Sequence, residues 1–255
     1  MSTYDFAAQR LYVEAPLFVG ARVEPSAPAQ NYLLNVLRLR AGDSILMFNG
    51  RDGEWRAEIA LVSRRATSLN VKEQTRAQTR GGDLEYAFAP LKQARLDYMA
   101  QKAAEMGADR LVPVLTRRTQ MRRVNVDRFR ANVIEAAEQC GLLHLPAMAE
   151  PIELERYLAS LAPDRFLIFC DEDAPVANPL AALSAAAPVA GERFSPPAVS
   201  LLIGPEGGFD AGEREQILRR SGVVIRLSLG PRILRADTAA VAALALVQAA
   251  IGDWQ

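Results

Sequence analysis

The sequence contains very little cysteine and histidine. Its 255 residues include two cysteines, Cys140 and Cys170, and a single histidine, His144. These residues lack the paired spacing of a zinc site, and two cysteines cannot build a disulfide framework. We therefore expect no metal centre and no fold that depends on cross-links.

The chain also lacks an excess of charge of either sign and a long apolar run. Lysine plus arginine and aspartate plus glutamate number 30 each, so the total charge indicates no particular partner. The first ten residues lack the basic and apolar regions of a signal peptide, and the alanine-rich stretch after residue 236 is too short to cross a bilayer. We expect a soluble cytoplasmic protein of one or two domains.

Charge is nevertheless distributed unevenly along the chain. Between residues 117 and 130 a single acid, Asp127, is accompanied by six arginines: Arg117, Arg118, Arg122, Arg123, Arg128 and Arg130. A local basic stripe in a neutral protein predicts an anionic partner at one face. The alternative is an ordinary solvated surface of helix and loop.

The first 75 residues have the pattern of a small β-rich domain. Runs rich in β-branched and aromatic residues predict strands over residues 10–16, 44–50, 54–63 and 67–74. The pairs Asn49-Gly50 and Asp52-Gly53 predict a tight hairpin. One helix is expected over residues 27–39. Together these elements predict a small β-barrel over residues 1–75.

Beyond a polar linker that contains Gly81 and Gly82, predicted strands alternate with helices. Strands are expected over residues 84–90, 110–116, 165–170, 199–204 and 223–230, and helices over 91–107, 126–141, 211–222 and 237–252. This alternation predicts a mostly parallel sheet with helices on both faces. The Pro/Ala-rich residues 171–197 are expected to form a surface connection.

Two strands of this region end in Gly-Pro. The first reads LLIGPEGGFD over residues 201–210, and the second reads LSLGPRILRADTAA over residues 227–240. Asp210 and Glu213 fit a capping box at the start of the next helix, and Gly222 fits the position just after its end. Both loops thus connect a strand to a helix, which is where open α/β sheets bind ligands. Neither matches a dinucleotide or P-loop fingerprint.

The segments LLIGPEGGFDAGE and LSLGPRILRADTAA together resemble the signature of the SPOUT methyltransferases. The likeness is greatest to the RsmE-type family, which methylates N3 of a uridine in small-subunit ribosomal RNA. The stretches NYLLNVLRLRAGD, QKAAEMGADRLVPVLTRRTQ and AAEQCG are similar to family segments in the same order. The sequence departs from the family at Leu142, where arginine is usual, at Asp237, where glutamate is usual, and at Arg117, where the family has an acid.

This resemblance implies a PUA-like RNA-binding β-barrel over residues 1–75 and a trefoil-knotted SPOUT α/β domain over residues 76–255. It also implies a homodimer and S-adenosylmethionine as the cofactor, without a metal. The two Gly-Pro loops would line the cofactor cleft, with contacts from Leu202, Gly204, Pro205, Glu206, Gly207, Leu229, Gly230, Ile233, Leu234 and Thr238.

For catalysis, the resemblance implies that Arg235 stabilises negative charge on the uracil carbonyl oxygens. Arginine stays protonated, so the proton acceptor would be Glu206 or Asp237. The alternative for Arg235 is a salt bridge to either carboxylate that braces the loops. The 16S ribosomal RNA of the 30S subunit would follow a basic track with phosphate contacts from Arg10, Arg38, Arg117, Arg122 and Arg123.

Three other functions remain open at the level of sequence. A SPOUT methyltransferase could act on another base or on a ribose hydroxyl. A non-catalytic RNA-binding assembly factor would be expected to have damaged cofactor loops. A nucleotide-binding enzyme of Rossmann type would need the glycine fingerprint that this chain lacks.

Overall fold

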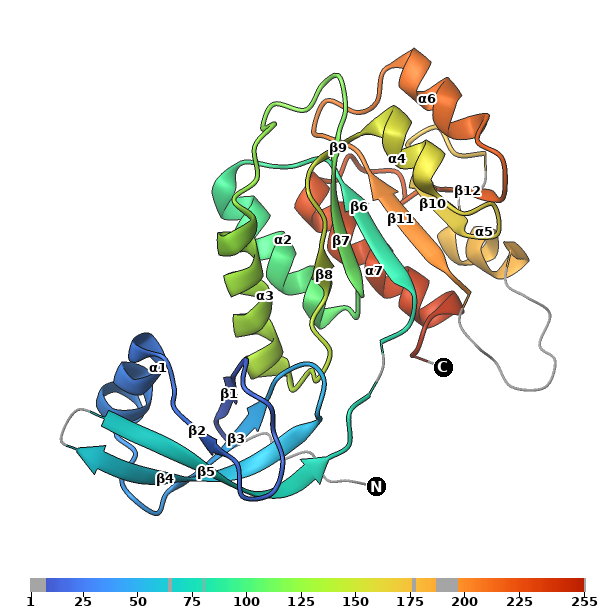
Figure 1. The fold of residues 1–255 in the computed structure, drawn as a ribbon. Coiled ribbons are helices and arrows are strands. Elements are labelled where there is room, and N and C mark those ends of the chain that lie inside the picture. Colours follow the sequence, from blue (N-terminus) through green and yellow to red (C-terminus); the bar gives the residue numbers. More distant parts are fainter. Residues whose placement is uncertain (1–7, 64–65, 80, 176–177, 187–196, 255) are drawn as a thin grey trace. The chain divides into compact units, whose positions relative to one another are not determined.

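A computed structural model describes residues 8–254, apart from residues 64–65, 80, 176–177 and 187–196 (Figure 1). The described residues form two compact units. The first comprises the described residues before Arg80 together with the segment Ala137–Leu145, and the second comprises Gly81–Ala136 and the described residues from Pro146 onward. The sequence pattern did not predict that a segment from the middle of the chain belongs to the first unit.

The first unit contains a five-stranded sheet with the strand order β1-β3-β4-β5-β2. Its described elements are β1 (Arg10–Tyr12), β2 (Arg22–Val23), α1 (Ala27–Asn31), the π-helical turn η1 (Tyr32–Val36), β3 (Ser44–Phe48), β4 (Glu54–Ser63) and β5 (Ala66–Arg76). β1 pairs with β3 in parallel, and the other strand pairs are antiparallel. The helix predicted over residues 27–39 is present in its first part, where the Ser26 hydroxyl caps α1.

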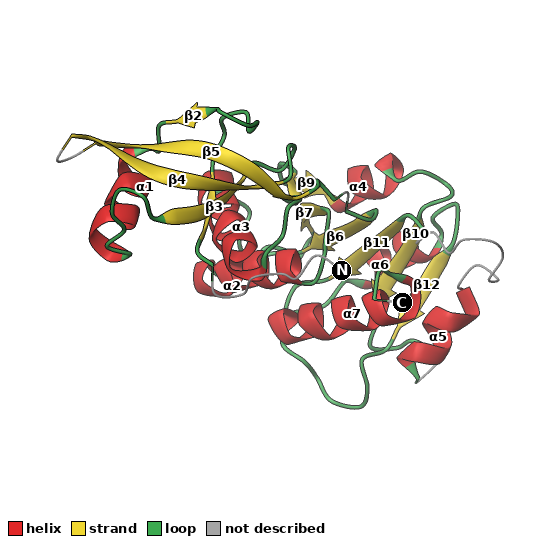
Figure 2. Cartoon of the chain, turned by 90° about the horizontal axis from the view of Figure 1, so that it is seen from below, coloured by secondary structure: helices red, strands yellow, loops and turns green. Residues whose placement is uncertain are grey.

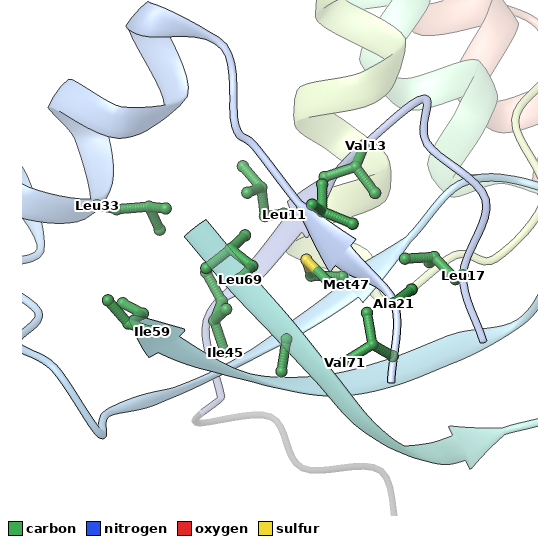
Figure 3. Packing of buried hydrophobic residues seen from close by; sticks show 12 residues of the cluster. Leu11, Val13, Leu17, Ala21, Leu33, Ile45, Met47, Ile59, Leu69 and Val71 are labelled. Atoms are coloured by element: carbon green, nitrogen blue, oxygen red, sulfur yellow. The ribbon is translucent and has the colours of Figure 1, made fainter. Parts of the chain in front are cut away.

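The core of the first unit is formed by side chains that alternate along these strands. Figure 3 shows Met47 of β3, Ile59 of β4 and Leu69 of β5 packed together with Leu33 of η1. The predicted hairpin joins β3 to β4 and requires glycine at residue 53. A Cβ atom there would lie 2.4 Å from the Arg76 carbonyl oxygen, and the φ angle is +82°.

The second unit is built on a parallel sheet with the strand order β12-β10-β11-β6-β7-β8, and β9 also pairs with β7. Its described strands are β6 (Leu84–Phe88), β7 (Arg110–Leu115), β8 (Ala147–Met148), β9 (Ile152–Glu153), β10 (Phe166–Cys170), β11 (Val199–Ile203) and β12 (Val224–Leu227). Its described helices are α2 (Gln93–Glu105), α3 (Val126–Cys140), α4 (Leu154–Ser160), α5 (Pro179–Ala186), α6 (Ala211–Leu218) and α7 (Ala236–Ile251). The last four residues of α3 belong to the first unit.

Helices cover both faces of this sheet (Figure 2). α7 packs against α2, α5 and β11, whereas α4 packs against α6 and β7. The central strands are buried along their whole length, as expected for parallel strands with helices on both faces. The predicted α/β architecture is confirmed, and the trefoil knot implied by the resemblance stays a prediction.

Several elements of the structure, among them the short strands β2, β8 and β9, were not predicted from the sequence. Residues 171–197, predicted to be a surface connection, contain the helix α5, and the unpredicted helix α4 follows β9. The helix predicted over residues 211–222 ends at Leu218, so Gly222 does not follow its last turn. Gly222 instead has a φ of +100°, and a Cβ atom there would lie 2.3 Å from the Pro163 carbonyl oxygen. No helix in the described ranges is long and apolar enough to cross a membrane.

Candidate functional site

The strand order brings distant parts of the chain to one edge of the sheet. β11 lies between β10 and β6, with Ile203 opposite Phe88 at the carboxyl ends of their strands. The Ala89 amide donates a 3.0 Å hydrogen bond to the Ile203 carbonyl oxygen. The first Gly-Pro loop and the start of α2 therefore lie side by side, although more than one hundred residues separate them. This edge is the usual ligand site of an open α/β sheet.

The first Gly-Pro loop is a tight turn that presents Glu206 to solvent. The Gly208 amide donates a 2.8 Å hydrogen bond to the Pro205 carbonyl oxygen, and the φ of Gly208 is +68°. This bond makes Glu206 the second residue of the turn, and its side chain is 46% exposed.

The glycine that precedes this turn is needed for packing. A Cβ atom at Gly204 would lie 2.5 Å from the Phe209 ring. That ring packs edge-on against Phe169 of β10, with 5.2 Å between the ring centroids. The close approach of Phe209 folds the loop back onto the sheet.

The predicted capping box is confirmed where this loop enters α6. The Glu213 amide donates to Asp210 Oδ1 over 2.8 Å, and the Asp210 amide donates to Glu213 Oε2 over 3.0 Å. The Arg117 amide donates a hydrogen bond to Glu213 Oε1, and the Arg117 guanidinium forms an ion pair with Asp210. The hydrogen bond from the Glu213 amide and the charge of Arg117 hold the pKa of Asp210 below its ordinary value.

The second Gly-Pro segment, residues 228–235, crosses the carboxyl edge of the sheet. It leaves β12 and leads into α7, whose first turn lies beside α2, the helix that follows β6. β12 and β6 are three strand positions apart, or about 14 Å. Eight extended residues reach up to about 26 Å, so the segment is long enough to cover this distance without being fully extended.

Residues 228–234 offer unused backbone groups and apolar side chains. Within the described part of the chain, none of them makes a backbone–backbone hydrogen bond. Gly230 has a φ of +96° and open space where a Cβ atom would be, and the Ile233 side chain is 99% exposed. Free amide and carbonyl groups beside exposed apolar side chains fit an adenosine group, which needs both.

The two segments meet at Arg95 in the first turn of α2. Arg95 Nη1 forms an ion pair with Glu206, and Arg95 Nε lies 4.0 Å from Asp237 Oδ2. The structure therefore brings together the two carboxylates predicted as proton acceptors. Arg95 was not among the site residues predicted from the sequence.

Arg235 lies exposed directly before α7. No ion pair or side-chain hydrogen bond of Arg235 occurs within the described ranges, so it does not form the predicted alternative brace to Glu206 or Asp237. The Thr238 amide donates to its neighbour Asp237 over 3.0 Å. The catalytic role of Arg235 stays a prediction.

Two of the predicted contact residues are buried. Leu202 has no exposed surface and packs in the core between the sheet and the helices α4 and α6, so its side chain does not face a ligand. Arg10 is 4% exposed, which contradicts the predicted phosphate contact. Its guanidinium binds Glu54 and donates to the carbonyl oxygens of Ala137 and Leu142.

The other predicted RNA contacts are exposed. Arg38 has a φ of +57°, which is unusual for a residue with a side chain. Arg117 pairs with Asp210, Arg122 pairs with Glu153, and Arg123 is exposed. In the residues that the structure describes, no group of three His, Cys, Asp or Glu side chains is placed to hold a metal ion.

Comparison with known proteins identifies the family. Residues 79–248 match the RNA methyltransferase domain family, and residues 26–70 match the RNA methyltransferase PUA domain family. The chain is 31% identical over 240 residues to Ribosomal RNA small subunit methyltransferase E of Rickettsia conorii, with 94% of each chain covered. The chain belongs to this family.

Two further relatives agree with this assignment. Ribosomal RNA small subunit methyltransferase E of a Synechocystis species is 29% identical over 251 residues, with 95% of this chain and 78% of the relative covered. The crystal structure of the Neisseria gonorrhoeae family member bound to S-adenosyl methionine superposes with a TM-score of 0.81 at 25% identity, covering 97% of this chain and all of the other. The PUA and methyltransferase fold predicted from the sequence is thereby confirmed.

Proposed function

We propose that this protein transfers a methyl group from S-adenosylmethionine to N3 of a uridine in 16S ribosomal RNA of the 30S subunit, in the cytoplasm. The observation that carries the proposal is the 31% identity, over 94% of both chains, to a family member named for methylation of small-subunit ribosomal RNA. The bound S-adenosyl methionine of the Neisseria gonorrhoeae relative supports the choice of cofactor.

The two Gly-Pro segments would hold the cofactor. Backbone groups of residues 228–234 would bind the adenine, and Leu229, Ile233 and Leu234 would cover its faces. The turn with Glu206 and Gly207 would form the opposite wall. S-adenosylmethionine supplies a methyl group that its sulfonium centre already activates, so the protein has to position the acceptor rather than create a strong electrophile.

The acceptor nitrogen must lose a proton when its bond to the methyl carbon forms. Arg235 would donate to a uracil carbonyl oxygen and stabilise the negative charge that develops there. Glu206 or Asp237 would take the N3 proton, directly or through water. The pairing of both carboxylates with Arg95 supports their placement in the same cleft.

RNA would approach along the exposed arginines. Arg38 in the first unit and Arg117, Arg122 and Arg123 in the second would contact phosphates, which positions the RNA without reading its sequence. Arg10 is not part of this set because it is buried.

We further infer a homodimer, the common arrangement of soluble oligomers. The alanine-rich helix α7 is itself largely buried against α2, α5 and β11, so its composition does not require a partner. Light scattering on the purified protein tests this inference.

The decisive experiment combines the purified protein, labelled S-adenosylmethionine and 30S subunits from cells that lack the modification. The RNA is digested to nucleosides, which are then fragmented in a mass spectrometer. N3-methyluridine releases a methylated base, whereas 2′-O-methyluridine releases an unmodified base, so the two candidate products can be told apart. N3-methyluridine is the expected product. A ribose-methylated product, or a label on another base, would show that uridine N3 is not the acceptor. If the cofactor binds but no methyl group is transferred, the 30S subunit is excluded as the substrate.

A further inference from the structure

The guanidinium of Arg95 lies between two segments that are separate in the chain. Glu206 belongs to the turn after β11, and Asp237 belongs to the first turn of α7. Arg95 pairs with the first and lies 4.0 Å from the second. Two carboxylates close to one cation repel each other less than they would alone, so the position of each depends on the arginine.

The two segments differ in how firmly they are held elsewhere. In addition to its contact with Arg95, the first loop is held by two hydrogen bonds. One is the internal bond of its turn, and in the other Arg118 Nη1 donates to the Gly207 carbonyl oxygen over 2.6 Å. The second segment has no backbone–backbone bond over residues 228–234 in the described chain. The contact of Asp237 with Arg95 therefore lies where this stretch, which has no such bonds of its own, enters the packed helix α7.

We propose that Arg95 is a positioning residue that couples the two Gly-Pro segments through Glu206 and Asp237 and so sets the width of the cleft between them. The inference rests on the proposed function, since that cleft is the one assigned to the cofactor. It also explains why no carboxylate among the described residues pairs with Arg235. Arg95 does the bracing, and the Arg235 guanidinium stays available to the substrate.

Amide hydrogen exchange on the ligand-free protein tests the coupling directly. Arg95→Gln removes the charge and both contacts, and we expect exchange to accelerate severalfold at the hydrogen-bonded amides of both segments, those of Gly208 in the first loop and of Thr238 and Ala239 at the start of α7. Arg128→Gln is the matched control, because Arg128 pairs with Asp97 on the same turn of α2 without contacting either loop. Unchanged exchange at both segments in Arg95→Gln, or equal acceleration in the control, would overturn the proposal.

Calorimetric titration with S-adenosylmethionine gives an independent readout. We expect the Kd of Arg95→Gln to rise by up to about fivefold, with a smaller change in turnover at saturating cofactor, because preorganisation of the cleft is lost. Arg95→Lys keeps the charge but lacks the fork that reaches two carboxylates, so it should restore binding only in part. If Arg95→Gln is poorly folded, the lysine variant still decides, because a Kd of Arg95→Lys equal to that of the wild type would contradict the need for two contacts.

A double-mutant cycle separates coupling from general stabilisation of α2. Adding Asp237→Asn to Arg95→Gln should raise the Kd little further, since both changes break the same tie. Fully additive effects would contradict the proposal. A wild-type protein that does not bind the cofactor would refute the proposed function instead, and the exchange data on ligand-free protein would still decide whether Arg95 couples the segments.

Discussion

Two arginine–carboxylate clusters in this molecule are built in opposite ways. In the first unit, one carboxylate, Glu54, lies between two guanidinium groups, those of Arg10 and Arg76. In the second unit, one guanidinium, that of Arg95, lies between two carboxylates. The Glu54 side chain is 4% exposed and the Glu206 side chain is 46% exposed.

Burial decides what each cluster does. In the first cluster the arginines also donate to the carbonyl oxygens of Ala137, Gly141 and Leu142. Removal of one partner would leave a buried charge without compensation, so the fold depends on a complete cluster. In the second cluster water solvates the charges, and each pair contributes at most about 1 kcal/mol. Its side chains can therefore move or exchange partners without unfolding the protein.

The largest expected effect follows from removal of the buried carboxylate. Glu54→Gln should lower the free energy of unfolding by about 3–5 kcal/mol, because both arginines lose their counter-ion. Arg95→Gln should lower it by less than about 1 kcal/mol. Urea denaturation of both variants measures the contrast, and equal losses would show that burial does not separate the two clusters.

The same cluster should make the protein sensitive to acid. Burial acts to raise the pKa of Glu54, but hydrogen bonds from Arg76 and Thr75 and the charge of Arg10 outweigh it, so the pKa lies below the ordinary value of 4.5. The stabilisation is therefore present above that value and is lost as the pH falls through the lower folded pKa. Below pH 4.5, the free energy of unfolding should fall more steeply in the wild type than in Glu54→Gln.

The next effect concerns catalysis rather than folding. Arg235→Ala should reduce the single-turnover rate of methylation by about 10²–10³-fold, because the developing charge on the uracil oxygen loses a donor. Cofactor affinity and the midpoint of urea denaturation should stay near their wild-type values. An unchanged rate with intact cofactor binding would remove Arg235 from the catalytic residues.

Two exposed arginines test the RNA track. Arg122→Ala combined with Arg123→Ala should weaken RNA binding and reduce the slope of log affinity against log salt by up to about two. The slope is measured by fluorescence anisotropy over a series of salt concentrations. Arg219→Ala, which breaks a surface pair with Glu215 on α6, serves as the control. A slope equal to that of the wild type would exclude this pair from the RNA footprint.

The smallest effect comes from the exposed arginine of the first unit that departs from ordinary backbone geometry. Arg38→Gly should raise the free energy of unfolding by up to about 1 kcal/mol, because glycine adopts a positive φ without strain. RNA affinity should fall at the same time if Arg38 contacts a phosphate. Higher stability with unchanged affinity would leave Arg38 without a role in binding.

Features that depend on neighbouring residues were predicted from the sequence. The capping box at Asp210 and Glu213 needs only a spacing of three residues, and the hairpin between β3 and β4 needs only its Asn-Gly and Asp-Gly pairs. The alternation of strands and helices likewise gave the architecture of the second unit. The resemblance to a family then supplied the cofactor and the proposed roles of the two loops.

Features that depend on strand order could not be predicted in this way. Arg95 joins the site because β6 lies beside β11 in the sheet, and no local pattern reveals that neighbour. Arg10 was predicted to be a surface residue because the local sequence of a strand does not reveal a buried carboxylate partner on another strand, here Glu54. α5 was missed because proline and repeated alanine gave no amphipathic period to recognise.

The helix α3 limits how this protein can be divided into fragments that fold. Its residues up to Ala136 belong to one compact unit, and the residues from Ala137 to the end of the helix belong to the other. The chain thus passes between the units more than once, and the two are not consecutive modules. A gene fragment that stops at the linker would encode a first unit without the backbone carbonyls that Arg10 and Arg76 bind. Recombination between relatives would have to exchange both pieces of that unit together to keep these arginines satisfied.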